Sequence, residues 1–166
     1  KVYAYADYVT INISSPNTPG LRQLQQKNEL DHLLSALKNA QQQLTVQHDK
    51  YVPLAIKIAP DLTEEELVVI ANKLLAYQID GVIATNTTLS RAGVENLPYA
   101  NEKGGLSGAP LLARSTEVVQ ILNKTLQDKI PIIAVGGVMS ATDVQKKLKA
   151  GARLVQIYTG LIYKGP

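Results

Sequence analysis

The chain has 166 residues, of which 45% are hydrophobic and 19% charged, a composition that is ordinary for one globular domain with a buried core. Its net charge of +3 is spread along the sequence, which disfavours a nucleic-acid partner, and the absence of cysteine excludes disulfides and thiolate metal sites. No apolar run reaches the roughly 18 residues that a membrane span needs, so we expect this chain itself to be soluble and to bind no metal.

The apolar runs of the chain predict five short strands. They lie at residues 8–13, 52–58, 81–85, 132–135 and 154–158. Their brevity and their content of Val, Ile and Ala are typical of parallel strands that are buried on both faces. Because helical segments alternate with them, the pattern predicts right-handed strand–helix–strand units and a parallel sheet.

Four amphipathic segments between the strands predict helices. They lie at residues 28–46, 63–77, 110–126 and 140–149. Thr63 and Glu66 have the spacing of a capping box, which begins the second helix. Pro110 is suited to the first turn of the third helix. Either Ser140 or Thr142 can cap the fourth.

Glycines near the end of the chain favour a closed barrel over an open sheet. No Gly-x-Gly-x-x-Gly follows the first strand, so the dinucleotide-binding fingerprint is absent. Gly136-Gly137 ends the fourth strand and Tyr158-Thr159 ends the fifth, and amides after the last two strands are the usual phosphate site of a (β/α)8 barrel. We therefore predict an α/β fold in which residues 1–166 form a single incomplete domain. It is a partial TIM (β/α)8 barrel with about strands 4 to 8, the N-terminal strands being missing.

Amides and hydroxyls cluster where the first and third strands end. Asn12 shares one strand face with Thr10, opposite the face of Ile11, so we expect Asn12 to point into the barrel. Asn86 and Thr87 follow the third strand. Such groups suit a planar ligand with hydrogen-bonding edges, and an Asx turn is the structural alternative at each position.

Lys57 lies on the strand face opposite Ile56 and Ile58, close to the carboxyl end of the second strand. A lysine at this place can present its ammonium group to a phosphate or to an electron-rich ring. The alternative is a lysine whose stem packs on apolar surface while its charge stays in water. The residues alone leave both interpretations open.

Ser15 follows the first strand, between Ser14 and Pro16. The commoner role of such a serine is to form a turn through its own backbone. As a base, an alcohol needs a proton relay. His32 and His48 both fall on the first predicted helix, away from the strand ends, so Ser-His-Asp hydrolysis is disfavoured.

Five segments, in order, resemble the dihydroorotate dehydrogenase family. They are residues 12–22, 52–62, 80–88, 104–108 and 131–137, which extend across nearly the whole chain. The resemblance implies an FMN-binding (β/α)8 barrel. It also implies oxidation of dihydroorotate to orotate in de novo pyrimidine (UMP) biosynthesis.

The resemblance implies a role for eleven positions. Ser15 matches the base that removes the proton from C5 of dihydroorotate while a hydride leaves C6 for the flavin. Asn12, Asn17, Asn86 and Thr87 match positions that bind substrate or orotate. The matches to FMN-binding positions are Asn12, Lys57, Thr85, Gly108, Gly137, Tyr158 and Thr159.

Serine rather than cysteine at Ser15 resembles the class 2, quinone-reducing branch of the family. This implies a quinone acceptor reached through an N-terminal segment that the chain does not include. It also implies that the full-length protein is peripheral on the cytoplasmic side of the inner membrane. An earlier lysine and further substrate-binding asparagines of the family are missing as well, so we expect this chain to hold about half of the site and to be inactive by itself.

Two other functions are compatible with the pattern. A phosphate-binding isomerase or lyase would use the Gly136-Gly137 and Tyr158-Thr159 amides for a sugar phosphate. A non-catalytic half-barrel would act by pairing its exposed sheet edges with another chain. Bound flavin in the intact protein would discriminate against both.

Overall fold

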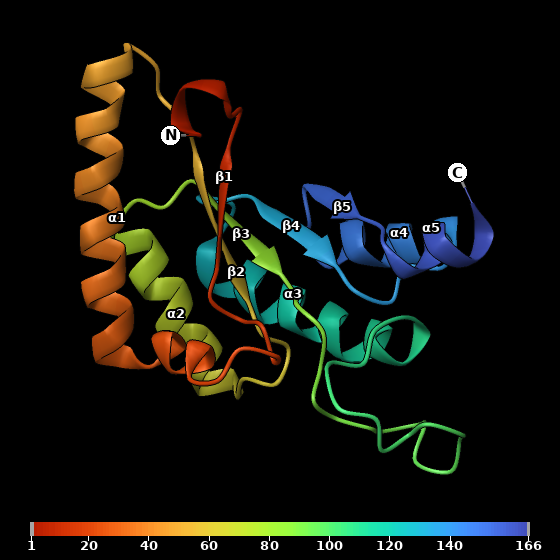
Figure 1. Ribbon diagram of the computed structural model, residues 1–166. Helices are drawn as coiled ribbons and strands as arrows, with labels where there is room; N and C mark the ends of the chain where they lie inside the picture. Colours follow the sequence, from red (N-terminus) through yellow and green to blue (C-terminus); the bar gives the residue numbers. More distant parts are fainter. Residues whose placement is uncertain (1, 166) are drawn as a thin grey trace.

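The computed structural model describes residues 2–165, which fold around a five-stranded parallel sheet (Figure 1). The strands are β1 (Val9–Asn12), β2 (Leu54–Ile58), β3 (Gly81–Ala84), β4 (Ile132–Val135) and β5 (Leu154–Gln156). They lie side by side in chain order. All the predicted strands are confirmed, and most are shorter than predicted because pairing stops before the turn residues at their ends.

Helices alternate with the strands, as the sequence pattern predicts. They are α1 (Lys27–His48), α2 (Glu64–Ala76), α3 (Leu112–Leu126), α4 (Ala141–Lys149) and the short α5 (Thr159–Lys164). Further short 3-10 helices lie at Tyr3–Tyr5, Leu21–Gln25 and Ala109–Leu111. None of the helices in residues 2–165 has both the length and the apolar composition that crossing a membrane requires.

The third predicted helix begins differently from the prediction. Pro110 lies in the 3-10 turn Ala109–Leu111, and the α-helix starts only at Leu112. Proline has no N–H and suits a first turn, and 3-10 geometry is common at such helix ends. α5 was not predicted as a separate helix, because its six residues are too few for an apolar periodicity to be read.

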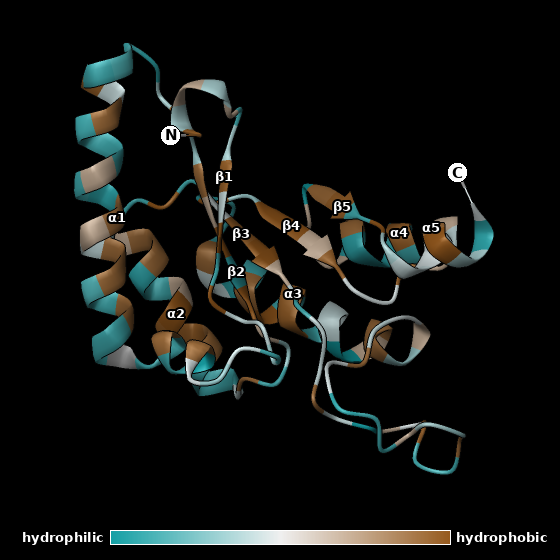
Figure 2. Ribbon diagram, viewed as in Figure 1, coloured by the Kyte–Doolittle hydropathy of each residue, from teal (hydrophilic) through white to brown (hydrophobic). Residues whose placement is uncertain are grey.

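The hydrophobic core lies between one face of the sheet and helices α1, α2 and α3. Leu34 of α1, Leu74 of α2 and Leu122 of α3 are fully buried in one cluster with Ile56 of β2. In Figure 2 the strands and the helix faces turned toward them are hydrophobic, whereas the outer surface of α1 is largely hydrophilic. Each such side chain contributes about 1.5–3 kcal/mol by its removal from water, so the core holds the helices on this face.

Polar side chains lie on the other face of β1 and β2. Thr10 and Asn12 are exposed, and Lys57 is the one residue of β2 that is only partly buried. The predicted alternation of faces is therefore confirmed in these strands. Within residues 2–165, β1 and β5 each pair with one neighbour, so the described sheet has two open edges.

The long segment between β3 and α3 projects from the body of the molecule (Figure 1) and is organised by Arg91. The Arg91 guanidinium donates to the carbonyl oxygens of Ala100 at 2.9 Å, Glu102 at 2.8 Å and Gly104 at 2.8 Å. Thr88 and Leu106 form an isolated antiparallel bridge at its base. One side chain thus satisfies main-chain acceptors that regular secondary structure would otherwise pair.

The structure shows which of Ser140 and Thr142 caps α4, a choice that the sequence leaves open. Thr63 and Glu66 form the predicted capping box at the start of α2. At α4 the cap is Ser140, whose hydroxyl accepts from the Asp143 N–H at 3.3 Å and donates to Asp143 Oδ2 at 2.8 Å. Thr142 is exposed inside the first turn instead.

Ser140→Ala is expected to lower the free energy of unfolding by about 1 kcal/mol, because the Asp143 N–H loses its side-chain acceptor and the Asp143 carboxylate loses the hydroxyl donor. The matched change Thr142→Ala removes a hydroxyl that caps nothing and is expected to change that free energy by less than about 0.5 kcal/mol. Urea denaturation of the two variants and of the wild type measures the difference. Equal effects of the two substitutions would contradict the assignment of the cap.

Candidate functional site

The carboxyl ends of the strands meet at one edge of the sheet, because neighbouring strands are parallel. Asn12 of β1 lies opposite Lys57 of β2, and Lys57 lies opposite Ile83 of β3. The Thr85 N–H, just after β3, donates to the Val135 carbonyl at the end of β4 at 2.8 Å. Parallel α/β proteins bind their ligands at this edge.

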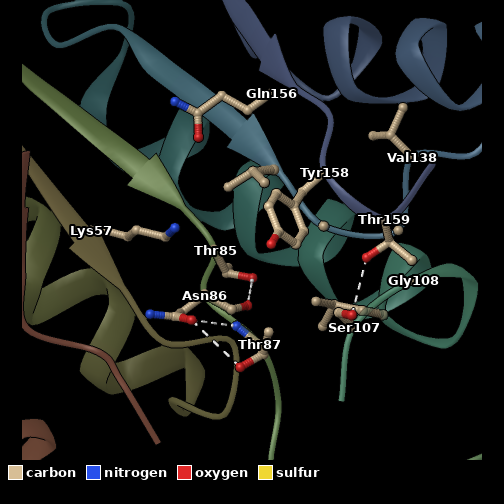
Figure 3. A pocket seen from close by; sticks show the side chains of 14 residues that line it. Lys57, Thr85, Asn86, Thr87, Ser107, Gly108, Val138, Gln156, Tyr158 and Thr159 are labelled. Atoms are coloured by element: carbon tan, nitrogen blue, oxygen red, sulfur yellow. Dashed lines mark hydrogen bonds between the residues drawn. The ribbon is translucent and has the colours of Figure 1, made fainter. Parts of the chain in front are cut away.

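A cavity of about 120 Å³ opens at this edge (Figure 3). It is lined by six of the predicted cofactor-binding residues, namely Lys57, Thr85, Gly108, Gly137, Tyr158 and Thr159, and by the predicted substrate-binding residues Asn86 and Thr87. Sites that enclose a whole drug-sized ligand measure roughly 300–1,000 Å³. The cavity is therefore large enough for only one part of such a ligand.

Lys57 brings a cation without a protein partner into this cavity. Its side chain is partly buried, and burial lowers the pKa of its ammonium group. Within residues 2–165 no hydrogen-bond acceptor or carboxylate pairs with it. In Figure 3 Lys57 and the Tyr158 ring extend into the space beside Thr85. An ammonium group that burial leaves underpaired favours a ligand with negative charge or acceptor atoms.

The far end of the cavity is built from glycines in close contact with α3 and α5. A Cβ on Gly137 would lie 2.4 Å from the backbone of Leu112, and one on Gly108 would lie 3.2 Å from Thr159 Cγ2. The Thr159 hydroxyl and the Ser107 hydroxyl are joined by a hydrogen bond of 3.0 Å. No side chain larger than hydrogen fits at Gly137, so the main chain itself forms this wall.

Backbone amides at this end are available to an anion. In the part of the chain that the structure describes, the N–H groups of Gly137 and Val138 donate to no protein acceptor. Both residues line the cavity. Main-chain amides in a glycine turn are a common binding site for phosphate. A cavity with free amides at one end and the Lys57 ammonium at the other is suited to a ligand that carries negative charge or acceptor atoms.

A hydrogen-bonded amide network lies beside Lys57. The Asn86 amide donates to Asn12 Oδ1 at 3.2 Å and to Ser14 Oγ at 3.1 Å. Ser14 also donates to Asn12 Oδ1 from its hydroxyl at 3.0 Å, and Asn86 Oδ1 accepts from the Thr87 N–H at 2.8 Å. The network fixes the amide orientations of Asn12 and Asn86, which are thereby preorganised for a planar partner.

Ser15 and Asn17 do not line the cavity. Ser15 Oγ accepts from the Asn17 N–H at 3.3 Å, which is the local turn contact that its position allows. The Thr18 hydroxyl lies 3.5 Å from Ser15 Oγ. Ser15 is partly exposed and Asn17 exposed. The structure thus places Ser15 on the same edge as Asn12 and Lys57, in the neighbouring loop.

That loop is packed against the segment that precedes α3. A Cβ built on Gly104 would lie 3.4 Å from Asn17 Oδ1. One built on Gly105 would lie 1.8 Å from Thr87 Oγ1 and 2.9 Å from Pro16 Cγ. The loop after β1 and two parts of the segment between β3 and α3 therefore meet at Gly105, and only glycine permits the contact.

Arg22 and Asp61 join the loops of the site, and neither was predicted as a site residue. The Arg22 guanidinium donates to the Ser14 carbonyl at 3.1 Å, the Thr87 carbonyl at 3.1 Å and Asp61 Oδ2 at 2.7 Å. Asp61 also accepts from the Leu89 N–H at 3.1 Å. One ion pair thus links the chain after β1, β2 and β3.

Thr18, Ser107 and Gln156 also lie at the site without having been predicted there. Ser107 and Gln156 line the cavity, and Thr18 contacts Ser15. Only Thr18 could have been found from the sequence, because it follows Ser15 by three residues in the same turn. The contacts of the other two join segments that are distant in sequence, which local patterns do not reveal.

A parallel sheet whose carboxyl edge carries a glycine-walled cavity belongs to the class of α/β proteins, in which this edge is the usual place of the functional site. The comparison with known families is more specific. The family model described as "Dihydroorotate dehydrogenase" matches residues 1–166, so the chain belongs to the dihydroorotate dehydrogenase family.

Curated relatives and solved structures agree with this family. The chain is 63% identical over 166 residues to the dihydroorotate dehydrogenase (quinone) of Nitrosomonas europaea, with 100% of the chain and 48% of the relative covered. It is 60% identical to that of Herminiimonas arsenicoxydans, with the same coverage. The crystal structure of DHODH in complex with ferulenol from Eimeria tenella matches with a TM-score of 0.93 at 41% identity, over 99% of this chain and 47% of that one. The chain thus spans about half the length of the proteins it matches.

Replacing Arg22 by lysine is expected to loosen the Ser14–Gly20 loop, because lysine retains the charge but cannot reach two carbonyl groups and Asp61 together. The loss of one or two hydrogen bonds corresponds to roughly tenfold faster amide hydrogen exchange in residues 14–20. Arg153→Lys is the control, since Arg153 pairs with Asp128 at an exposed site. Unchanged hydrogen exchange in residues 14–20 of the Arg22 variant would show that the Arg22 hydrogen bonds do not hold the loop.

Proposed function

We propose that the protein containing this chain oxidises dihydroorotate to orotate with FMN as cofactor and a quinone as electron acceptor, in pyrimidine (UMP) biosynthesis. The observation that carries the proposal is the single cavity shared by Lys57, Thr85, Gly108, Gly137, Tyr158 and Thr159, which come from after or within four different strands. The relatives named dihydroorotate dehydrogenase (quinone), at about 60% identity, support the reaction and the acceptor.

The cavity residues suit the two ends of FMN. The free amides of Gly137 and Val138, together with the Tyr158-Thr159 turn, would hold the phosphate, and Gly108 would allow the ribityl chain to pass close to the backbone. Thr85 and Lys57 lie where the ring system would begin. Asn12 reaches this region through its hydrogen bond to Asn86. FMN, when bound, supplies the acceptor for the hydride that leaves C6 of the substrate.

The amide residues would hold the substrate ring. Dihydroorotate has a planar ureide edge whose N–H and C=O groups alternate, and the side-chain amides of Asn12, Asn17 and Asn86 can pair with such an edge. The Thr87 hydroxyl, within 3.5 Å of Asn86 Oδ1, adds a further donor or acceptor. The network between Asn12 and Asn86 keeps these groups oriented before substrate arrives.

Ser15 would remove the proton from C5 of dihydroorotate as the C5–C6 bond becomes a double bond. A serine hydroxyl is a weak base, so its own proton has to move away during the step. The Thr18 hydroxyl, which is exposed, donates to Ser15 Oγ at 3.5 Å, so this hydrogen bond would have to reverse for Thr18 to accept that proton. The pair therefore offers a route for the proton from the substrate to solvent.

The rest of the protein would complete the site. We propose that residues 1–166 are one incomplete FMN-binding domain, which supplies about strands 4 to 8 of a (β/α)8 barrel, and that a separate N-terminal segment binds quinone. The in-order parallel pairing of β1 to β5 and their match to 47% of the DHODH chain from Eimeria tenella support this assignment. Location on the cytoplasmic side of the inner membrane as a peripheral protein belongs to the same proposal.

Ser15→Ala is expected to slow the reduction of bound flavin by dihydroorotate by a factor of about 10² to 10⁴, since the base is removed. The flavin content of the intact protein, measured from its visible absorbance spectrum, is expected to remain that of the wild type. Stopped-flow absorbance measures the reduction, and Ser35→Ala on the exposed surface of α1 is the control. A variant as fast as the wild type would remove Ser15 from the reaction, and intact protein without flavin would instead favour a phosphate-binding isomerase or lyase.

Lys57→Met is expected to lower the reduction potential of the bound flavin, because a positive charge near the ring stabilises the negative charge that reduction adds. A loss of about 1.4 kcal/mol corresponds to about 30 mV for a two-electron couple. Spectroelectrochemical titration measures the shift. Lys129→Met, an exposed lysine before β4 at the opposite edge of the sheet, is the matched control. An unchanged potential in the Lys57 variant would place its ammonium group away from the ring.

A further inference from the structure

We propose that Lys147 is a positioning residue for the cofactor phosphate, which it affects through Ser115 and the Gly136–Gly137 peptide without touching the ligand. The proposal rests on the function proposed above. It assigns a role to a buried cation that lies on α4, outside the cavity and behind its glycine wall.

A chain of hydrogen bonds connects Lys147 to the glycine turn. The Lys147 ammonium is fully buried and donates to Ser115 Oγ on α3. The Ser115 hydroxyl lies 2.9 Å from the Gly136 carbonyl and 3.2 Å from the Leu112 carbonyl, so its single proton is shared between these acceptors. The Lys147 charge on α4 thus polarises the Gly136 peptide group through the Ser115 hydroxyl.

The geometry of the peptide group carries this effect to the cavity. The Gly136 C=O and the Gly137 N–H belong to one planar trans peptide, in which they point in opposite directions. Because the Gly136 carbonyl is held toward Ser115, the Gly137 N–H points away from Ser115. Gly137 lines the cavity, and its N–H has no acceptor among residues 2–165. A cation that polarises the carbonyl also strengthens the N–H as a donor.

Tight packing fixes the position of this peptide. A Cβ on Gly136 would lie 3.0 Å from Leu111 Cδ2 and 3.1 Å from Ser115 Cβ. The Gly136 and Gly137 φ angles are +119° and +77°, which glycine adopts without strain. The turn therefore cannot tilt far from the direction that Ser115 imposes.

A purely structural role does not require a charge at position 147. Removing an ammonium group from water is costly, and an apolar side chain of similar length packs in such a place without that cost. Burial lowers the pKa of Lys147 to about 8, and the nearby Asp143 carboxylate opposes the shift. The ammonium form therefore predominates at pH 7. Only the Ser115 hydroxyl separates the buried Lys147 ammonium from the glycine turn. Attraction to the phosphate that this turn would bind accounts for a charge at position 147.

The test compares FMN with riboflavin, which has the same ring and ribityl chain but no phosphate. Dissociation constants of both are measured by quenching of flavin fluorescence, with the intact protein freed of its flavin. Lys147→Met is expected to weaken FMN binding about tenfold and to leave riboflavin binding unchanged. Lys149→Met, at an exposed position of the same helix, removes the same charge and is expected to change neither constant.

Ser115→Ala provides a second variant, which retains the lysine and breaks the connection to Gly136. It is expected to reproduce the selective loss of FMN affinity, and it decides the matter if Lys147→Met does not fold. Equal weakening of FMN and riboflavin would assign Lys147 and Ser115 a structural role only and overturn the proposal. Unchanged FMN binding in both variants would also overturn it, while leaving the proposed function intact. A wild-type protein that binds neither flavin would overturn both.

Discussion

Parallel pairing of consecutive strands is the constraint on which this site depends. Asn12, Lys57, Thr85, Gly137 and Tyr158 come from within or after five different strands, yet in-register pairing brings all five strand ends to the same level. The register is in turn set by burial, because a slip of one residue would exchange the face that packs on α1, α2 and α3 for the polar face. The hydrophobic core therefore determines where the polar groups of the site lie, although it contains none of them.

The site divides into a rigid part and a part that tertiary contacts hold. Lys57 projects from a strand that is otherwise buried, and Gly137 is pressed against α3, so neither can move without disturbing the core. Ser15 lies in a loop that depends on Arg22 and its ion pair with Asp61. An ion pair between partly exposed groups stabilises a loop less than packing in the core would. The Gly137 end of the cavity is therefore the more rigid part, and the loop that carries Ser15 is the part that can move more easily.

Local sequence patterns predicted the helices and strands, but they could not predict contacts between residues that are distant in the sequence. The strands and the capping box at Thr63 follow from apolar periodicity and short-range spacing, which is why they were predicted nearly to the residue. Periodicity also placed Asn12 and Lys57 on the polar face. By contrast, Arg22 and Asp61 are separated by 39 residues, and Ser115 and Lys147 by 32. Nothing near any of these four side chains in the sequence indicates its partner, since the fold alone brings them together.

The contact at Gly105 has a consequence for the residues that this position can accept. The loop after β1 and the segment between β3 and α3 meet at a position where even a methyl group would overlap Thr87 and Pro16. A substitution there would displace the turn that carries Ser15 from the strand end that carries Asn86, at a distance from the glycine wall at Gly137. The separation of these two loops is therefore controlled at a single backbone position.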